Sequence, residues 1–535
     1  MFMKWSHSLQ NKGLKSALSF NNPTLYIPLL VVLLVIHACY FNHLVDDAFI
    51  SFRYAKNFVE GKGLTYNAGE KVEGYTNFLW VIVLSTSYLF QLPLEITAKI
   101  LGMLLSITII ILLYIQTTRN SGAKNFWCLV PAIFLAANGS FALWTLGGLE
   151  TSLFTFLLLL GSSFYIQNHR DTSTARSYPF IFALLAMTRP EGLFVFATTI
   201  LHKMAFEREK ATIGEAGKDI FRFLIIFLPY FLWRFYYYGY PFPNSYYAKV
   251  ANNWFQFLKG YEYVQNFYSS FGSIIILLPI LFVLQYYKEF WASYYLCLVG
   301  VYSIYICYVG GDQLLIFRFF APILPFLYML FADSLKKIYF YVVEKWSTSL
   351  HRSLFIKAGS LLIFFFIIVN TMRPSFYGPE YKRIVLEKKV EKDRMIIGKW
   401  IKNFWPASTK IALVPAGIIP YYSEFYSIDL VGLNDLHIAH AQVPDFGKGK
   451  YQGHQKYDCE YVLSQKPDYI FLDPCLLYDD TFTHVQFREF LSKFAYLAPV
   501  AAKMQLRKDF EKNYGLRKIR VSPQKNFFAF KRTGD

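Results

Sequence analysis

Long apolar stretches alternate with polar loops over the first 373 residues. They predict a polytopic α-helical membrane protein, because a hydrocarbon core about 30 Å thick takes about 20 apolar residues per helical crossing. The stretches lie at 25–41, 77–90, 98–116, 127–146, 152–167, 178–188, 193–204, 221–237, 271–286, 291–308, 319–335 and 353–370. A basic segment precedes the first stretch and no small-residue cleavage site follows it. We therefore expect an uncleaved first span with a cytoplasmic N terminus.

Three of these stretches are too short to cross a membrane by themselves. Stretch 77–90 has only 14 residues, and we interpret it as a partial or re-entrant helix. Stretches 178–188 and 193–204 are separated by a polar break at 189–192, which predicts two half-helices that meet at a polar tip. Irregular backbone at membrane depth requires a cavity or buried protein around it. Without stretch 77–90, about eleven crossings remain.

The loops fall into two classes by charge. Mostly basic loops, expected in the cytoplasm because positive loops stay inside, lie at 167–176, 202–222, 285–290 and 336–352. Loops with isolated charges among Gly, Pro, Tyr and Asn lie at 42–76, 147–151, 189–192, 238–270 and 310–318. The second class is expected on the extracytoplasmic face, where we place the function.

Hydropathy falls after Pro374, which divides the chain into a transmembrane domain, 1–373, and a soluble extracytoplasmic domain, 374–535. In the second part we expect a helix over 380–404, a short helix over 418–424, and strands at 410–414, 427–431, 468–472 and 527–531. Alternating strands and helices are typical of an α/β domain. Cys459 and Cys475 could form a disulfide there, since an extracytoplasmic domain is in an oxidising compartment.

Composition agrees with a multi-pass membrane protein. The 535 residues are 55% hydrophobic and 20% aromatic, and the formal net charge is +18. That charge fits cytoplasmic loops and attraction to anionic membrane lipid. Nucleic-acid binding is not expected, because the basic residues are spread over loops rather than gathered in one patch. We expect the protein in the cytoplasmic membrane.

An acid pair, Asp46 and Asp47, follows the first apolar stretch. A charge at a membrane boundary is costly unless it is solvated, paired or used. The helical spacing of Ala48, Phe52 and Ala55 predicts an amphipathic helix on the membrane surface, with the acid pair in or just before its first turn. Capping this helix would occupy one carboxylate, so the second one indicates a functional role.

Other charged residues share the predicted outer face. Glu150 either carries a helix N-terminal charge or faces a site, and the Arg189–Glu191 pair either fixes a turn or lines a cavity. Lys249 ends an aromatic segment and could bind phosphate as a point charge. Arg318 begins a span and requires an anion, such as a lipid phosphate. Asp435, His454 and Lys456 are candidate site residues of the soluble domain.

Nucleotide and zinc-protease motifs have no persuasive context in the sequence, so nucleotide-driven transport and zinc proteolysis lack support. An outer-face acid pair and cations without a nucleotide site instead indicate a pre-activated donor in the membrane. A polyprenyl-phosphate sugar meets that requirement.

Seven motifs together resemble the mycobacterial terminal β-(1→2)-arabinofuranosyltransferase family, which belongs to the GT-C superfamily of lipid-linked-sugar transferases. They are Asp46–Ala55, Gly61–Asn67, Glu73–Asn77, Gly148–Thr151, Thr188–Gly192, Gly310–Asp312 and Gly453–Lys456. The resemblance extends from the first loop to about residue 475. The last motif has Gln455 where the family usually has Glu.

The resemblance implies a GT-C membrane fold, a polyprenyl-phosphate sugar donor and a glycan acceptor bound with help from the C-terminal domain. In this superfamily an acid of the first outer loop acts as general base on the acceptor hydroxyl, and the lipid phosphate leaves with inversion. Asp46 or Asp47 matches the base, and we favour Asp46 because Asp47 is better placed to cap the helix or bind metal.

The resemblance also suggests roles for the other motif residues. Candidates for binding the donor phosphate are Arg53, Arg189, Lys249 and Arg318. Candidates for binding substrate are Glu73, Tyr75, Asn77, Glu150, Glu191, Asp312, Asp435, His454 and Lys456. No cofactor is required because the phosphate already activates the sugar. A divalent cation (Mg, Mn or Ca) on Asp46, Asp47 and Glu150 is the alternative.

We therefore expect an inverting glycosyltransferase that modifies a cell-envelope glycan at the outer face of the cytoplasmic membrane, with arabinofuranose a candidate sugar. A transporter or flippase of lipid-linked glycans is the main alternative, and an assembly scaffold is a third. The large soluble domain and the absence of evident repeat halves favour the enzyme over a transporter.

Overall fold

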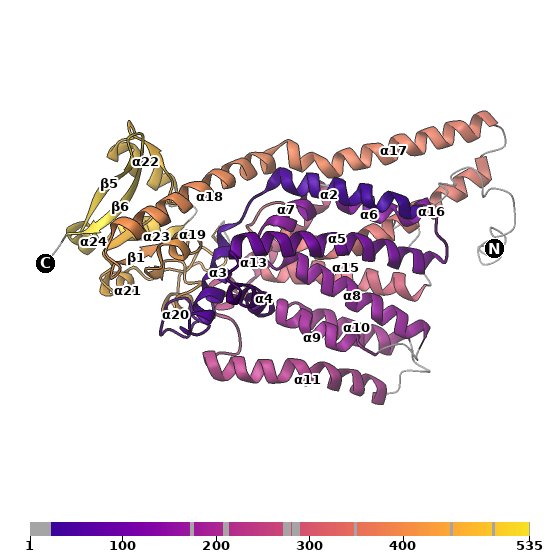
Figure 1. Cartoon of the computed structure of the whole chain (residues 1–535), viewed down its shortest axis with the longest axis horizontal. Coiled ribbons are helices and arrows are strands. Elements are labelled where there is room, and N and C mark those ends of the chain that lie inside the picture. Colours follow the sequence, from indigo (N-terminus) through magenta and orange to yellow (C-terminus); the bar gives the residue numbers. More distant parts are fainter. Residues whose placement is uncertain are drawn as a thin grey trace.

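The computed structural model describes residues 23–171, 176–206, 213–270, 280, 289–346, 350–449, 453–494 and 498–533. The basic N-terminal segment lies outside the described residues, as does the predicted span 271–286 except for Ile280. Parts of the basic loops 167–176, 202–222, 285–290 and 336–352 also lie outside them. A bundle of helices runs along the long axis of the molecule, and a mixed α/β region covers one end of it (Figure 1).

The bundle contains helices of very different lengths. They are η2 (Pro23–Tyr26), α2 (Ile27–Phe41), α3 (Asp46–Val59), α4 (Phe78–Leu89), α5 (Leu94–Ser121), η3 (Phe126–Cys128), α6 (Val130–Ala137), α7 (Gly139–Leu146), α8 (Thr151–Arg170), α9 (Tyr178–Thr188), α10 (Gly192–Phe206), α11 (Ile213–Tyr238), α12 (Asn244–Lys249), α13 (Trp254–Ser270), α15 (Phe290–Val309), η5 (Arg318–Ile323), α16 (Leu324–Trp346) and α17 (Leu350–Phe376).

Several of these helices can span a membrane. By length and composition, six helical segments among the described residues qualify, or seven if the bent pair α6–α7 makes one crossing. The multi-pass membrane class is confirmed, although this number is below the predicted eleven. Part of the difference comes from 127–146, where the chain bends by 61° between α6 and α7. Asn138 lies at this bend and its side chain caps α7. The orientation of the spans stays a prediction.

The short predicted helices form where the sequence placed them. The helix α4 covers Phe78–Leu89, and the polar break separates α9 from α10. Both α9 and α10 are shorter than a full crossing and pack against each other, while α8 and α11 pack on α9 and α15 packs on α10. Neighbouring helices therefore surround the break, as irregular backbone at membrane depth requires.

The first-loop helix α3 begins at Asp46, as predicted, but it does not lie on the membrane surface. It packs between α4 and the C-terminal helix α19 (Ile418–Ser423). Most of its side chains are buried, including Phe49, Ile50, Phe52 and Tyr54. These large apolar groups point in several directions around the helix, so no wide polar face is left for water.

The C-terminal region combines helices with one mixed sheet. Its elements are α18 (Pro379–Phe404), β1 (Lys410–Leu413), α19, β2 (Tyr426–Asp429), α20 (Leu436–His440), α21 (Cys459–Ser464), β3 (Tyr469–Phe471), β4 (Tyr478–Asp479), α22 (His484–Phe494), α23 (Pro499–Gln505), α24 (Lys508–Asn513), β5 (Tyr514–Ser522) and β6 (Lys525–Arg532). The strand order is β2-β1-β3-β6-β4, and β5 pairs with β6. Strand β1 is parallel to β2 and β3, whereas β6 is antiparallel to β3.

The predicted α/β architecture is confirmed, with two corrections. Strands β4 and β5 were not predicted. Cys459 and Cys475 are both free and buried in the structure, so the suggested disulfide does not form. Cys459 lies in α21 and Cys475 follows β3. The boundary between the two predicted domains stays a prediction; helix α17 continues past it to Phe376.

Candidate active site

Asp46 joins the first loop to the C-terminal region. Its two carboxylate oxygens accept the backbone N–H groups of Gly417 (2.9 Å) and Ile418 (3.1 Å), at the start of α19. The same carboxylate pairs with Arg394 of α18, Oδ1 to Nη1, at 3.0 Å. Both carboxylate oxygens of Asp46 are therefore occupied by partners in the C-terminal region.

Asp47 has a different environment. Its carboxylate makes no hydrogen bond or ion pair with any described residue. Desolvation by the surrounding protein raises the pKa of Asp47, and the nearby charges of Lys249 and Arg318 oppose that rise. Asp47 is thus a carboxylate near two cations but committed to neither, which is the state required of a general base.

Lys249 is the last residue of α12 and lies against the C-terminal region. The φ of Gly453 is +78°, and a Cβ there would come within 2.9 Å of Cε and 3.0 Å of Cγ of Lys249. Glycine is therefore needed at 453 both for its backbone conformation and for this close approach. Within the described ranges, the Lys249 ammonium has no acceptor, so it remains available to an anion.

Arg318 begins η5 and is held on one side only. Its Nε donates to Asp312 Oδ2 at 2.7 Å, and its guanidinium lies over the rings of Trp144 and Phe319 at 5.5 and 5.2 Å. Its two Nη groups make no hydrogen bond in the part of the chain that the structure describes. Arginine presents such groups in a planar fork that matches phosphate oxygens.

His454 brings the C-terminal region to the same place. Its Nε2 lies 3.3 Å from the Gln313 side-chain nitrogen. Burial, together with the charges of Lys249 and Arg394, lowers the pKa of His454 to about 4, so the ring is neutral at neutral pH. We call this group the Asp47 cluster. It consists of Asp46, Asp47, Lys249, Asp312, Gln313, Arg318, Arg394 and His454.

A second group of predicted residues forms a buried network beside the cluster. Arg189 donates to Glu150 (Nη1 to Oε1, 3.0 Å) and to Glu191 (Nε to Oε1, 2.5 Å). Asn77 donates to the other Glu150 oxygen at 2.7 Å and exchanges hydrogen bonds with Ser51 of α3. The network therefore connects the break before α10, the start of α8 and the first loop.

Similar solved structures identify the fold of this chain. No curated protein matches the chain, and residues 382–526 match a family described as a domain of unknown function (DUF8728). ArnT from Cupriavidus metallidurans, solved with undecaprenyl phosphate, is similar over 95% of this chain and 97% of its own, at TM-score 0.53 and 10% identity. The Archaeoglobus fulgidus oligosaccharyltransferase, solved with Zn and sulfate, is similar over 94% and 73%, at TM-score 0.51 and 12% identity.

The chain has the GT-C fold. The predicted fold is thereby confirmed, while membership of the GT-C superfamily and of the arabinofuranosyltransferase family stays a prediction. In this fold the Asp47 cluster lies where α3, α12 and the loop before η5 meet the C-terminal region. Arg394 and Gln313 were missed by the sequence analysis, because a charge on a polar helix or an amide in a loop resembles ordinary surface.

Two of the predicted phosphate ligands have other roles in the GT-C structure. Arg189 is buried between two carboxylates, so its charge is already balanced. Arg53 donates to the backbone oxygens of Tyr66 (2.7 Å), Pro420 (2.5 Å) and Phe425 (2.8 Å) and joins the first loop to the C-terminal region. Their contact with the donor phosphate stays a prediction, although these partners already use most of their donors.

Other predicted substrate residues also lie outside the cluster. Glu73 forms a buried ion pair with Arg234 of α11 at 2.5 Å, and the Tyr75 hydroxyl lies 3.0 Å from the Tyr238 hydroxyl. Both contacts fasten the first loop to α11. The structure therefore assigns Glu73 and Tyr75 to holding this loop in place.

In the C-terminal region, Asp435 and Lys456 likewise have structural partners. Asp435 caps α20 through the Ile438 N–H at 3.0 Å and accepts the Tyr461 hydroxyl at 3.2 Å. Lys456 donates to the Ala441 carbonyl at 2.5 Å and packs over the Phe446 ring. Only His454 of the three predicted residues in this region joins the cluster.

The predicted set of metal ligands does not come together. Glu150 belongs to the Arg189 network, apart from the acid pair. Over the ranges that the structure describes, no group of three or more His, Cys, Asp or Glu side chains is placed to hold a metal ion. The choice between a metal-free reaction and a divalent cation stays a prediction.

Proposed function

We propose that this chain is an inverting glycosyltransferase that moves a sugar from a polyprenyl-phosphate donor to a hydroxyl of a cell-envelope glycan. One observation carries the proposal: Asp47 is an uncommitted carboxylate flanked by Lys249 and Arg318, two cations with free donors. A base for the acceptor and cations for the departing phosphate are the two requirements of this reaction.

The comparisons support a lipid-phosphate donor. A protein of the same fold was solved with undecaprenyl phosphate, and a donor of this class suits a site at the junction of membrane helices and soluble domain. The motif resemblance makes arabinofuranose the first sugar to test. We place the reaction on the extracytoplasmic face, which the loop charges predict for the C-terminal region.

In the proposed reaction, Asp47 accepts the proton of the acceptor hydroxyl as that oxygen attacks the anomeric carbon. The bond between this carbon and the phosphate oxygen breaks, and polyprenyl phosphate leaves with the electron pair, so the configuration inverts. Lys249 and Arg318 stabilise the charge on the departing phosphate. Asp312 positions Arg318 through their 2.7 Å contact.

Asp47, rather than the initially favoured Asp46, is the proposed base. Asp46 is bound to the backbone at α19 and to Arg394, and removing it from these contacts would loosen the C-terminal region. The neutral ring of His454 and the amide of Gln313 lie at the same junction. We assign them to hydrogen bonding with the acceptor sugar.

The test uses the full chain, purified in nanodiscs, with radiolabelled polyprenyl-phosphate sugars that include the arabinofuranose donor. Release of polyprenyl phosphate and label on glycan are both measured. Asp47→Asn is expected to lower kcat by about 10²–10⁴-fold, the usual contribution of a general base. Asp480→Asn, at an exposed carboxylate of the C-terminal region, is the matched control and should keep full activity.

Circular dichroism and thermal unfolding separate lost chemistry from lost folding. Near-full turnover by a folded Asp47→Asn variant would remove the base assignment. Lipid movement in sealed vesicles without any transfer of label would support the flippase instead.

A further inference from the structure

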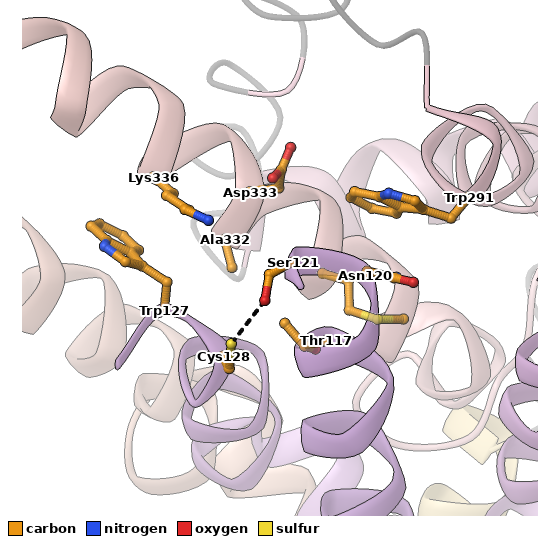
Figure 2. A pocket seen from close by; sticks show the side chains of 10 residues that line it. Thr117, Asn120, Ser121, Trp127, Cys128, Trp291, Ala332, Asp333 and Lys336 are labelled. Atoms are coloured by element: carbon orange, nitrogen blue, oxygen red, sulfur yellow. Dashed lines mark hydrogen bonds between the residues drawn. The ribbon is translucent and has the colours of Figure 1, made fainter. Parts of the chain in front are cut away.

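Charges of both signs line the pocket between α5, η3, α15 and α16. The carboxylate of Asp333 and the ammonium of Lys336 both belong to its lining, together with Ser121 and Cys128 (Figure 2). A lining with both charges favours neither an anionic nor a cationic ligand, because each charge repels what the other attracts. On the surface of helix α18 the two signs are separated instead.

Helix α18 keeps its acidic side chains inward and presents basic ones to solvent. It contains eight Lys or Arg residues and four Asp or Glu residues. All four acids are buried or half-buried, whereas six of the basic residues are exposed. Along α18, which the structure describes from end to end, every exposed charged side chain is therefore basic. They are Lys382, Arg383, Lys389, Lys392, Lys399 and Lys402.

The acids of α18 fasten the helix to the rest of the chain. Glu391 Oε2 lies 2.7 Å from Nδ1 of the buried His43 ring, in the connection before α3. Asp393 accepts the backbone N–H of Leu477 at 3.1 Å. These contacts direct the acidic residues toward protein, so the opposite side of the helix has an excess of positive charge.

Four of the exposed lysines form a ridge on that side. Residues 389, 392, 399 and 402 are separated by intervals of three and seven positions, and such intervals bring helical side chains to one face. The ridge extends over 13 residues, about 20 Å along the helix axis. We call it the lysine ridge. It consists of Lys389, Lys392, Lys399 and Lys402.

Two lysines of the ridge keep their full charge. Across the described parts of the chain, Lys392 has no ion-pair partner. The Lys399 ammonium lies over the Tyr422 ring, 4.8 Å from its centroid. Contact with the face of a ring does not neutralise a cation, so both ammonium groups are available to an anion.

The other two lysines share their acids with other donors. Lys389 lies 3.5 Å from Asp393 Oδ2, the oxygen that also accepts a backbone N–H. Lys402 donates to Glu424 at 2.6 Å, and Glu424 also pairs with Lys56 of the first loop. One carboxylate thus serves two ammonium groups. Exposed ion pairs of this kind are weak, and the ridge as a whole remains positive.

The position of the ridge favours a soluble polyanion over a membrane surface. Helix α18 continues from the candidate span α17 into the C-terminal region (Figure 1). Lys389 and Lys402 follow its first residue, Pro379, by 10 and 23 positions, or about 15 and 35 Å along the axis. Attraction to lipid headgroups falls off within a Debye length, about 8 Å at physiological ionic strength.

We propose that the lysine ridge binds an anionic polysaccharide. A linear polymer with carboxylate or phosphate groups along its length can contact all four ammonium groups at once, which adds up individually weak contacts. Ile396, 44% exposed, lies between Lys392 and Lys399 and offers an apolar surface to the C–H face of a sugar ring.

The ridge flanks the Asp47 cluster, because Arg394 of that cluster belongs to the same stretch of α18. We therefore assign the bound polymer to the acceptor glycan, held on the ridge while one of its sugars reaches the site. This assignment as acceptor rests on the proposed function, whereas the binding of the polymer to α18 does not.

The test is a binding titration of the full chain in phosphatidylcholine nanodiscs, with a fluorescent alginate oligosaccharide as the anionic probe and no sugar donor present. Replacing Lys389, Lys392 and Lys399 together by Gln is expected to weaken binding about ten- to a hundredfold, because each lysine near an anionic surface adds to the attraction. Arg at the same three positions keeps the charge and should restore binding, which separates lost charge from lost folding.

The matched control removes the same amount of charge elsewhere in the C-terminal region. Lys503, Lys508 and Lys512 are exposed on α23 and α24, and their joint replacement by Gln should leave binding within about twofold of wild type. Equal losses in the ridge and control variants would assign the effect to net charge and overturn the proposal. Equal binding of neutral dextran would overturn it as well.

A lipid probe tests the other class of partner. Phosphatidylglycerol is added to the detergent-solubilised chain, and thermal unfolding is measured. Stabilisation that the Gln ridge variant loses, while its alginate binding stays unchanged, would assign the ridge to the membrane. Because these measurements contain no donor, their failure is distinct from a failure of the Asp47 assignment, which only turnover measures.

Discussion

Asp46 and Asp47 are neighbours in sequence, and successive side chains of a helix point about 100° apart. In the first turn of α3 this rotation directs Asp46 to the start of α19 and Asp47 toward Lys249 and Arg318. The sequence analysis expected one carboxylate to be used structurally and the other chemically, and the chemical role stays a prediction. Its preference for Asp46 as base depended on Asp47 capping α3, but neither side chain caps that helix.

At the residue scale we predict the pH dependence of turnover. Asp47 acts as a base only when ionised, and desolvation raises its pKa. The single-turnover rate should therefore rise with pH through an inflection above the ordinary aspartate value and then level off. Lys249→Gln removes a charge that lowers this pKa, so its inflection should move to higher pH as the rate falls. An unmoved inflection would show that the titrating group is not Asp47.

At the scale of elements, the contact between α3 and α19 holds the soluble part against the bundle. The backbone at Gly417 approaches Asp46 so closely that a Cβ at position 417 would lie 1.9 Å from the Asp46 carbonyl oxygen. Arg53 also donates to the carbonyl oxygens of Pro420, within α19, and of Phe425, just after it. A helix with this many cross-links to the C-terminal region has no face left for a membrane surface.

Gly417→Ala should consequently destabilise this contact by about 1–3 kcal/mol, the usual cost of overpacking a closely packed site. Gly217→Ala on α11 is the control, because a Cβ there meets nothing within 4 Å. Alanine at an exposed helical site stabilises by up to about 1 kcal/mol. Thermal unfolding and limited proteolysis of the C-terminal region measure both changes. Equal stability of the two variants would contradict the proposed importance of the contact.

At the scale of the whole molecule, three of the loops that the sequence analysis assigned to the outer face gather at one end, while the face itself stays a prediction. The loops that contain Asp46, Lys249 and Asp312 meet the C-terminal region there. Side chains from both parts of the chain are therefore needed to complete the cluster. The α/β region contributes His454 and Arg394 to this junction, and it also buries acids of its own.

Burial of Asp473 predicts a pH effect on the stability of the whole protein. Desolvation raises its pKa to about 6, and only one of its carboxylate oxygens accepts the Tyr478 hydroxyl. Between pH 4 and about 6 the folded state thus binds more protons at Asp473 than the unfolded state does. The free energy of unfolding therefore falls as pH rises through this range. Asp473→Asn does not ionise and should gain stability relative to wild type over this range.

Parallel thermal unfolding of both proteins between pH 4 and 7.5 measures the difference in Tm. A constant difference across the range would exclude Asp473 as a titrating group. Asp429, whose pKa burial also raises to about 6, remains intact in both proteins and cancels in the comparison.

Much of the architecture could be predicted because it depends on local patterns. Apolar length, the polar break at 189–192 and the change in hydropathy after Pro374 located the bundle helices and the α/β region. The bend at Asn138 was missed, because the sequence on both sides of it is apolar. Hydropathy gives no signal for the hydrogen bond by which the Asn138 side chain caps α7. Strand β5 was missed because its exposed edge is rich in charged residues.

The chain's own pattern was enough to determine a membrane protein with a soluble α/β region and an acid pair at their boundary, since burial in lipid and helix periodicity are properties of neighbouring residues. Which charges balance one another was decided only in three dimensions. Arg53, Arg189 and Lys249 look alike in the sequence. Arg53 and Arg189 are engaged by partners that include residues 372 and 39 positions away, while the Lys249 ammonium has no acceptor among the described residues. Coulombic and hydrogen-bonding partners depend on distance in space. The fold therefore left the Asp47 carboxylate near Lys249 and Arg318 without a hydrogen-bond or ion-pair partner among the described residues, and this is why we propose it as the base.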